Sequence, residues 1–193
     1  IRVTPPLTRT VPDLHRFRLA RPLPLLADIL DRIHAETEAD YVIFTNADIA
    51  VMPFFYVSLA RLIEQGYDAL VVNRRTIPDR PRRVTELPLM YAEIGTPHPG
   101  YDCFLFQYEQ FPRFHLGRIC VGTAWVGRTL LANMIRFSNR FREFRDLHLT
   151  FHLGDEQSWR NGELSDYQEF NHAEFLSIFA GLERESPRLC IPE

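Results

Sequence analysis

Apolar residues recur at regular spacings along the first half of the chain and predict alternating helices and strands. Between residues 25 and 37 they return every three or four positions, as on the buried face of a helix. A second helix is predicted from Pro53 to Gly66, and short apolar runs predict strands over 41–45 and 68–73. Because a helix of crossover length joins these two strands, we expect them to be parallel neighbours in one sheet.

The second half of the chain continues with similar elements. The elements predicted there are strands over 101–106, 118–121 and 147–151 and helices over 125–137 and 171–181. Residues 171–174, Asn-His-Ala-Glu, resemble a capping box that begins the last helix. Strands that alternate with helices in this way indicate an α/β fold with a mostly parallel sheet flanked by helices.

Two Pro-rich segments interrupt the pattern. Residues 1–24 are expected to form an extended arm, because Pro lacks an amide proton and disfavours helix in the residue before it. Residues 74–100 show no apolar periodicity and predict a long irregular loop, either a lid that becomes ordered on substrate or a rigid packed segment. We therefore expect an arm, a single domain over 25–181 and a C-terminal tail over 182–193.

Composition limits the class of protein. The chain has 193 residues, of which 46% are hydrophobic, enough for the core of one domain. Its net charge of −3 does not suggest a nucleic-acid partner, since such binding rests on clustered Lys and Arg. The longest apolar run, 49–60, is too short to span a bilayer, so no membrane segment is expected in this chain. Three cysteines at no metal-ligand spacing favour a reducing compartment, and we predict a cytoplasmic location.

A polar triplet, Asn46-Ala47-Asp48, follows directly after the first predicted strand. In open α/β sheets, ligands bind just beyond the carboxyl ends of the strands. An amide oxygen and a carboxylate two residues apart can both face one bound cation there, and that cation can hold a diphosphate. The alternative is an Asx turn that caps the following helix.

His152 is the second candidate ligand. It follows the predicted strand over 147–151 and precedes a Gly turn, which puts the imidazole at a sheet edge. Oxygen donors together with one imidazole suit Mn²⁺ or Mg²⁺, with phosphate oxygens and water completing an octahedron. The alternative is an ordinary buried or capping histidine.

Two acids are candidate catalytic residues. Asp102 lies at the start of the predicted strand over 101–106, next to the Pro-rich segment, and Asp155 comes shortly after His152. An inverting group transfer needs a carboxylate that takes the acceptor's hydroxyl proton, whereas a retaining transfer does not. Turn capping or simple solvation is the alternative for each acid.

Three arginines are candidate substrate-binding residues. Arg74 and Arg75 follow the predicted strand over 68–73, at the same sheet edge as Asn46, and Arg21 lies in the N-terminal arm. The guanidinium group suits a diphosphate or an anionic acceptor. The alternative is that these side chains are simply solvated.

Taken together, these features resemble the nucleotide-sugar glycosyltransferases of the GT-A fold. Asn46-Ala47-Asp48 looks like a variant of their Asp-x-Asp signature, and His152 resembles the late histidine that completes metal coordination in that family. The resemblance implies a GT-A-like fold, a nucleotide-sugar donor, an acceptor that the sequence does not identify, and sugar transfer assisted by Mn²⁺ or Mg²⁺.

The chain departs from that family at two places. Asn46 stands where many members carry an acid, and only the residues 1–24 precede the first helix, where the family has a nucleotide-binding strand–helix–strand unit. Either the arm supplies a shortened unit or the chain is N-terminally truncated. The alternative function is a non-catalytic GT-A-like binding module that has lost donor binding.

Overall fold

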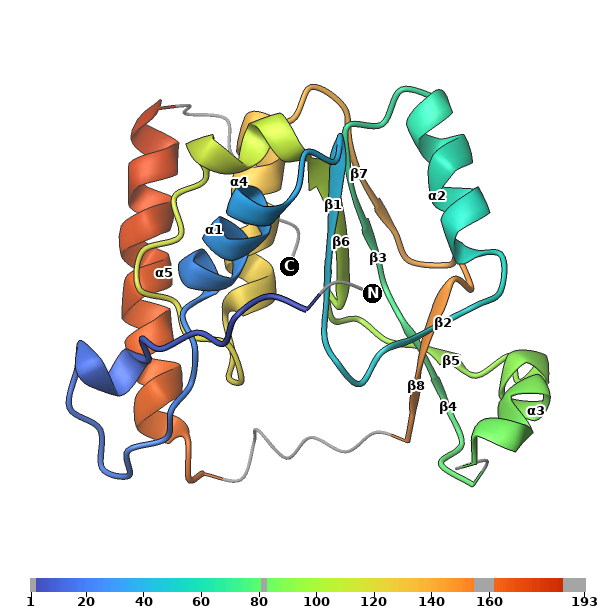
Figure 1. The fold of residues 1–193 in the computed structure, drawn as a ribbon, viewed down its shortest axis with the longest axis horizontal. Helices are drawn as coiled ribbons and strands as arrows, with labels where there is room; N and C mark the ends of the chain where they lie inside the picture. The colour runs from blue at the N-terminus through green and yellow to red at the C-terminus, as the bar shows by residue number, and fades with distance from the viewer. Residues whose placement is uncertain (1–2, 81–82, 155–161, 186–193) are drawn as a thin grey trace. The chain divides into compact units, whose positions relative to one another are not determined.

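The structure is a computed structural model that describes residues 3–80, 83–154 and 162–185 (Figure 1). These residues separate into two compact units, each described by itself below. The first unit holds the described residues of 1–40, 108–137 and 157–193, and the second holds those of 41–107 and 138–156. Residues 25–181, which were predicted to form a single domain, contribute to both units.

The second unit is built on a four-stranded sheet in the order β1-β6-β3-β7. Its strands are β1 (Tyr41–Thr45), β6 (Cys103–Gln107), β3 (Ala69–Val72) and β7 (Phe141–Phe144). β6 is antiparallel to both β1 and β3, whereas β3 and β7 are parallel. β1, β3 and β7 therefore run in one direction, and the predicted α/β class, with parallel strand pairs and flanking helices, is confirmed. The sheet is mixed rather than mostly parallel, because β6 pairs antiparallel with both of its neighbours.

The prediction that the strands at 41–45 and 68–73 are neighbours is wrong. They run parallel to each other, but β6 lies between them. The helix between two strands predicts their relative direction, but it does not show whether a later strand inserts between them. Because β6 is antiparallel, it begins at the edge where β1 and β3 end.

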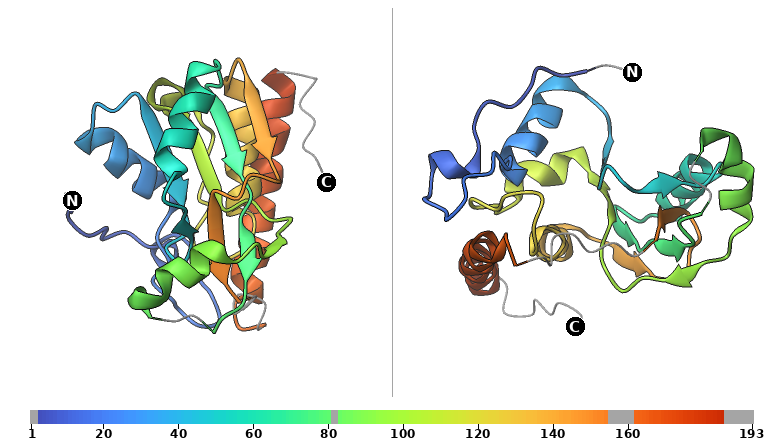
Figure 2. Two further views of the ribbon diagram at one scale, coloured as in Figure 1. Left: turned by 90° about the vertical axis from the view of Figure 1, so that its right-hand side faces the viewer. Right: turned by 90° about the horizontal axis from the view of Figure 1, so that it is seen from below.

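A second sheet continues from that edge, in the order β2-β8-β4-β5 (Figure 2). Its strands are β2 (Ala50–Val51), β8 (Thr150–Leu153), β4 (Arg75–Ile77) and β5 (Thr96–Pro97). The chain passes from β1 to β2, from β3 to β4, from β5 to β6 and from β7 to β8. Four connecting segments thus run between the two sheets, and they contain the candidate site residues Asn46, Asp48, Arg74 and Asp102.

The predicted irregular loop over 74–100 is in fact structured. It contains β4, the 3-10 helix η2 (Val84–Glu86), α3 (Leu87–Ala92) and β5. Elements of two to six residues are too short to show periodicity, which is why the sequence did not predict them. Met90 is buried and packs with Ile77 and Phe151, so the middle of the segment is attached to the second sheet.

One helix covers a face of the main sheet. α2 (Phe55–Glu64) lies alongside the sheet in Figure 1, and the helix predicted between Pro53 and Gly66 is confirmed. The buried residues of this core come from α2, from the two central strands and from the segments next to them: Phe55, Leu59, Tyr67, Leu70, Val72, Cys103, Leu105 and Leu149. This core holds β3 and β6 in place, and with them the segments where they end and begin.

The first unit is mostly helical. Its helices are α1 (Leu26–Glu36), α4 (Val126–Phe137) and α5 (Ser165–Glu185), with the 3-10 helices η1 (Val11–Asp13) and η3 (Tyr108–Arg113). α4 and α5 lie side by side (Figure 2). The helices predicted over 25–37 and 125–137 are confirmed.

The N-terminal arm packs against α5. Phe17 stacks on Tyr167 with ring centroids 3.8 Å apart, and the Tyr167 hydroxyl donates to the carbonyl of Leu19 over 2.8 Å. Val11, in η1, is fully buried. The arm therefore belongs to the hydrophobic core of the first unit.

Two predictions in this unit are wrong. Residues 118–121 form no strand apart from an isolated bridge between Leu25 and Cys120. Asn171 does not begin the last helix, because α5 starts at Ser165 and Asn171 lies buried within it. Its amide instead accepts the backbone N–H of Cys120 and donates to the carbonyls of Cys120 and Ala124. From the sequence alone, a buried asparagine that hydrogen-bonds to a loop backbone cannot be distinguished from an asparagine that caps a helix.

Candidate functional site

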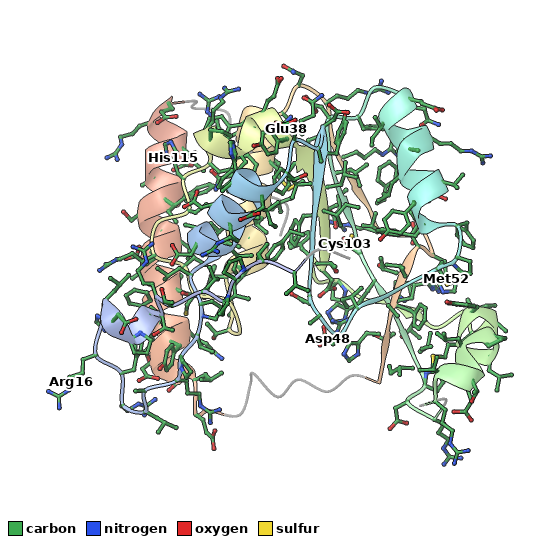
Figure 3. The ribbon with its side chains drawn as sticks, in the orientation of Figure 1. Arg16, Glu38, Asp48, Met52, Cys103 and His115 are labelled. Carbon is green, nitrogen blue, oxygen red and sulfur yellow. The ribbon has the colours of Figure 1, made fainter. Side chains whose placement is uncertain are left out.

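Asp48 and His152, predicted to share a cation, lie together in the second unit. Asp48 lies in the connection from β1 to β2 (Figure 3), and His152 lies on β8. β2 and β8 are antiparallel, with Ala50 opposite Phe151, so His152 lies next to the residues that precede β2, and Asp48 is one of them. His152 Nε2 is 3.3 Å from Asp48 Oδ2. The predicted convergence of these two residues is present in the structure.

The hydrogen bonding of His152 defines what it presents to Asp48. Its Nδ1 lies 2.8 Å from the carbonyl oxygen of Gly154. A carbonyl oxygen can only accept, so Nδ1 carries the hydrogen, and the neutral ring points the lone pair of Nε2 towards the carboxylate. A lone pair and a carboxylate oxygen at this distance repel each other unless a proton or a cation lies between them. A backbone carbonyl that fixes the histidine tautomer is also typical of metal-binding histidines.

Asp102 and Asn46 form a second pair at the same edge. Thr45 lies opposite Cys103 in the β1–β6 pairing, and the Thr45 hydroxyl donates to the backbone carbonyl of Asp102 over 2.9 Å. One residue further on, Asn46 Nδ2 donates to Asp102 Oδ1 over 3.3 Å. The antiparallel insertion of β6 is what brings Asp102 to the end of β1.

Arg74 completes this group from the end of β3. Its Nη1 lies 3.2 Å from Asp102 Oδ1, the same oxygen that accepts from Asn46. Both side chains of the ion pair are buried, with 10% and 8% of their surface exposed. Asp102 Oδ2 and Arg74 Nε are buried and have no hydrogen-bond partner among the described residues. The ion pair therefore uses only one oxygen of the carboxylate.

Burial dominates the titration of Asp102. It raises the pKa of the carboxyl group, and the positive charges of Arg74 and His98 offset only part of that rise. His98 was not predicted as a site residue. Its backbone N–H donates to the carbonyl of Arg74 over 3.1 Å, which fixes the segment before Asp102. The His-Pro-Gly sequence that precedes Tyr101 and Asp102 was the signal that could have indicated it.

The other predicted arginines have internal partners. Arg75 Nη2 donates to the carbonyl of Gly95 over 2.9 Å, and its Nε donates to the carbonyl of Ile94. Arg21 lies in the first unit and pairs with Glu163 over 2.6 Å. These contacts hold loop and arm segments, and a role for Arg75 or Arg21 in substrate binding stays a prediction.

Asp155, a candidate catalytic residue, lies outside the described residues. Within the described ranges no group of three His, Cys, Asp or Glu side chains is arranged to hold a metal ion. The side chains that could hold a cation here are those of Asp48 and His152, 3.3 Å apart, with the amide of Asn46 two residues before Asp48.

The donors present fit a divalent cation. In an octahedral complex with metal–ligand distances of about 2.1 Å, adjacent ligand atoms lie about 3 Å apart. The 3.3 Å between Asp48 Oδ2 and His152 Nε2 is close to that spacing. Mg²⁺ and similar ions are commonly held by one or two protein carboxylates together with substrate phosphates and water, so a complete protein cage is not required.

Comparison with solved structures finds two similar chains, both of S. aureus TarS, a glycosyltransferase, residues 1–349. The chain in complex with UDP-GlcNAc aligns with a TM-score of 0.45 and 11% identity, and the other with 0.42 and 10%. The alignments cover 78% and 80% of this chain but 48% and 50% of TarS 1–349, so the chain spans about half the length of those structures. At these values the likeness by itself assigns neither an activity nor a ligand to this chain.

No protein-family model matches the sequence, and no curated protein matches it. Among the described residues, no helix is both long enough and apolar enough to cross a membrane.

Proposed function

We propose that this chain is a glycosyltransferase that uses a nucleotide-sugar donor and a divalent cation, Mn²⁺ or Mg²⁺. The observation that carries the proposal is the 3.3 Å approach of His152 Nε2 to Asp48 Oδ2 at the edge where β1 ends. Both atoms point a lone pair into the same space, and both belong to the motif positions that resemble the GT-A family. A nucleotide sugar is the donor class that such an edge site with a cation would hold.

The protein groups have distinct roles in this proposal. Asp48 and His152 hold the cation, and the amide oxygen of Asn46 adds a neutral donor beside them. Arg74 offsets the charge of Asp102, and together they support Asn46 from the buried side. The cation, when bound, supplies Lewis-acid stabilisation to the departing diphosphate. An inverting transfer would in addition use a carboxylate base, for which Asp155 and Asp102 are the candidates.

Asn46 and the Asp48–His152 pair favour different functions, a non-catalytic binding module and a glycosyltransferase. A neutral amide binds a cation more weakly than a carboxylate does, and this favours a non-catalytic module that has lost donor binding. The lone pairs of Asp48 and His152 favour retained binding. The two functions differ in whether the purified chain binds nucleotide sugars in a metal-dependent manner.

Calorimetry tests the proposal without knowledge of the acceptor. The 193-residue chain is titrated with a panel of nucleotide sugars, including UDP-GlcNAc, in Mn²⁺ and in EDTA. We expect binding of at least one donor that is lost in EDTA and lost in Asp48→Ala. Asp31→Ala is the matched control, because Asp31 is an exposed acid on α1 of the first unit. Absence of binding to every donor in Mn²⁺ would support the binding-module alternative.

A further inference from the structure

We infer that Asp102 is a positioning residue, which orients the Asn46 amide so that its carbonyl oxygen faces the cation site. The inference rests on the proposed cation site of Asp48 and His152. It assigns Asp102 a role that acts through Asn46 rather than through contact with substrate, and this leaves Asp155 as the candidate base for an inverting transfer. The contacts of Asn46, Asp102 and Arg74 carry it in three steps.

The first step is the direction of the Asn46 amide. Asp102 Oδ1 already accepts a hydrogen bond from Arg74 Nη1, so the group of Asn46 that faces this oxygen is the amide NH₂, which donates to it over 3.3 Å. The amide is planar, and its oxygen therefore points away from Asp102. Asn46 is exposed, and the terminal torsion of an asparagine has two broad minima, so without a partner either end could face the cation. An NH₂ group turned towards a cation would repel it.

The second step is the rigidity of Asp102 itself. Its backbone carbonyl accepts from Thr45, and its Oδ1 accepts from Arg74 as well as from Asn46. Asp102 is 6% exposed. A buried carboxylate held at several points is a fixed acceptor for a side chain that is itself exposed.

The third step explains why residue 46 is an amide. An aspartate at this position would place two carboxylates about as close together as Asn46 and Asp102 are now. Like charges at that separation repel, and one carboxylate would have to take up a proton. With an amide at residue 46, the pair keeps a single carboxylate, on the buried residue 102, and a neutral ligand oxygen on the exposed residue 46.

Substitutions at residue 102 distinguish loss of the hydrogen-bond acceptor that orients Asn46 from loss of the negative charge of the carboxylate. In Asp102→Asn the new amide oxygen can occupy the position of Oδ1 and keep both hydrogen bonds, while its NH₂ takes the position of Oδ2, which has no partner among the described residues. Asp102→Leu has a similar volume and no acceptor. Because Arg74 would be buried alone in that variant, Arg74→Met/Asp102→Leu, which replaces the whole ion pair by apolar groups, serves as a second form.

The measurement is the affinity of the 193-residue chain for Mn²⁺ alone, followed by electron paramagnetic resonance of the free ion. We expect Asp102→Asn to bind within about twofold of the unmodified chain. Asp102→Leu, or the double variant, should bind about 10- to 100-fold more weakly, the usual effect of losing a group that orients a metal ligand. In the Asn46→Ala background, exchanging residue 102 should change the affinity by no more than about twofold, because there is no amide left to orient.

Asp68→Asn is the control for loss of a buried acid. Asp68 is also 6% exposed and accepts the backbone N–H groups of Asn139 and Arg140 over 2.7 and 2.8 Å, before β3 and away from the cation site. This variant should lose thermal stability and keep its Mn²⁺ affinity.

Three results would overturn the inference. An Asp102→Asn variant as weak as Asp102→Leu would assign the effect to charge. If residue 102 still affects the Mn²⁺ affinity in the Asn46→Ala background, the effect is a general structural one. If Asp102→Leu binds Mn²⁺ as tightly as the unmodified chain, Asp102 has no positioning role. Asp48→Ala distinguishes this failure from that of the proposed function: if it does not weaken Mn²⁺ binding, or if the unmodified chain binds none, the cation site and this inference fail together.

Discussion

His152 Nε2 lies 3.3 Å from Asp48 Oδ2, while Nδ1 of the same ring is bound to the carbonyl of Gly154. The two contacts leave the imidazole no donor for the carboxylate unless the ring is protonated at both nitrogens. The two side chains are joined directly when the ring carries both protons, and the cation of the proposed function would take the place of the Nε2 proton.

The tautomer of His152 follows from this geometry. In the metal-free chain at alkaline pH, we predict that the hydrogen resides on Nδ1, because Gly154 can only accept. Long-range ¹H–¹⁵N spectra of the histidine rings measure this directly, with His152→Gln identifying the signal. Addition of Mg²⁺ should shift the Nε2 resonance and leave Nδ1 protonated. A hydrogen on Nε2 in the metal-free chain would contradict the assignment.

The buried ion pair of Arg74 and Asp102 predicts an asymmetric effect on stability. Arg74→Met leaves a buried carboxylate without its cation, and we expect a loss of about 3 kcal/mol in the free energy of unfolding. Arg74→Met/Asp102→Leu removes both charges and should recover most of that loss. Urea denaturation of the single and double variants measures both values. Equal destabilisation in the two variants would show that the pair contributes through packing alone.

The sequence predicted the elements that are long or continuous. The apolar run at 41–45 and the helical spacings at 25–37 and 125–137 identify β1, α1 and α4 within a residue or two, because each buries a complete face. β2, β4 and β5 have two or three residues, and no periodicity can be detected over that length. The strand predicted over 147–151 was displaced for a similar reason, since Leu149 is buried in the core just before β8 begins at Thr150.

The candidate site was only partly predictable for a related reason. Asn46, Asp48 and His152 could be identified because each lies close to an apolar run. The contact of Asn46 with Asp102 depends on β6 lying between β1 and β3, and the order of strands in a sheet is not a local property of the sequence. Arg21 was grouped with Arg74 by residue type, yet it pairs with Glu163 in the first unit.

The pairing of Glu174 with Arg118 predicts a pH dependence of stability. Burial alone would raise the pKa of Glu174, but the hydrogen bonds and charge of Arg118 outweigh it and lower the pKa. A lowered carboxyl pKa stabilises the folded state above the ordinary value of 4.5, and this contribution is lost as the pH falls through the folded-state pKa. Because Arg118 is about half exposed, we expect Glu174→Gln to cost about 1 kcal/mol at pH 7.

Denaturation of the unmodified chain and of Glu174→Gln at pH 7 and at pH 3 measures the difference between their free energies of unfolding. It should shrink at pH 3, where Glu174 becomes protonated in the unfolded chain and increasingly in the folded chain. A difference that is constant between the two pH values would contradict the role of the charge.

The buried cysteines should be unreactive in the folded chain. Burial raises the pKa of the Cys103 and Cys120 thiols to about 12, so almost no thiolate is present at neutral pH. We predict that iodoacetamide at pH 8 labels neither residue until the chain is unfolded, as read by mass spectrometry of peptides. Rapid labelling of Cys103 in the native chain would show that β6 opens at the edge that carries Asp102.

The position of a bound Mn²⁺ ion tests the central claim most directly. Crystals of the chain grown with Mn²⁺, measured at the manganese absorption edge, would show the ion by its anomalous scattering. We predict one peak about 2.0–2.2 Å from both Asp48 Oδ2 and His152 Nε2, on the side of Asn46 that carries its amide oxygen. An ordered Mn²⁺ at another place, with Asp48 and His152 free of metal, would contradict the proposed cation site.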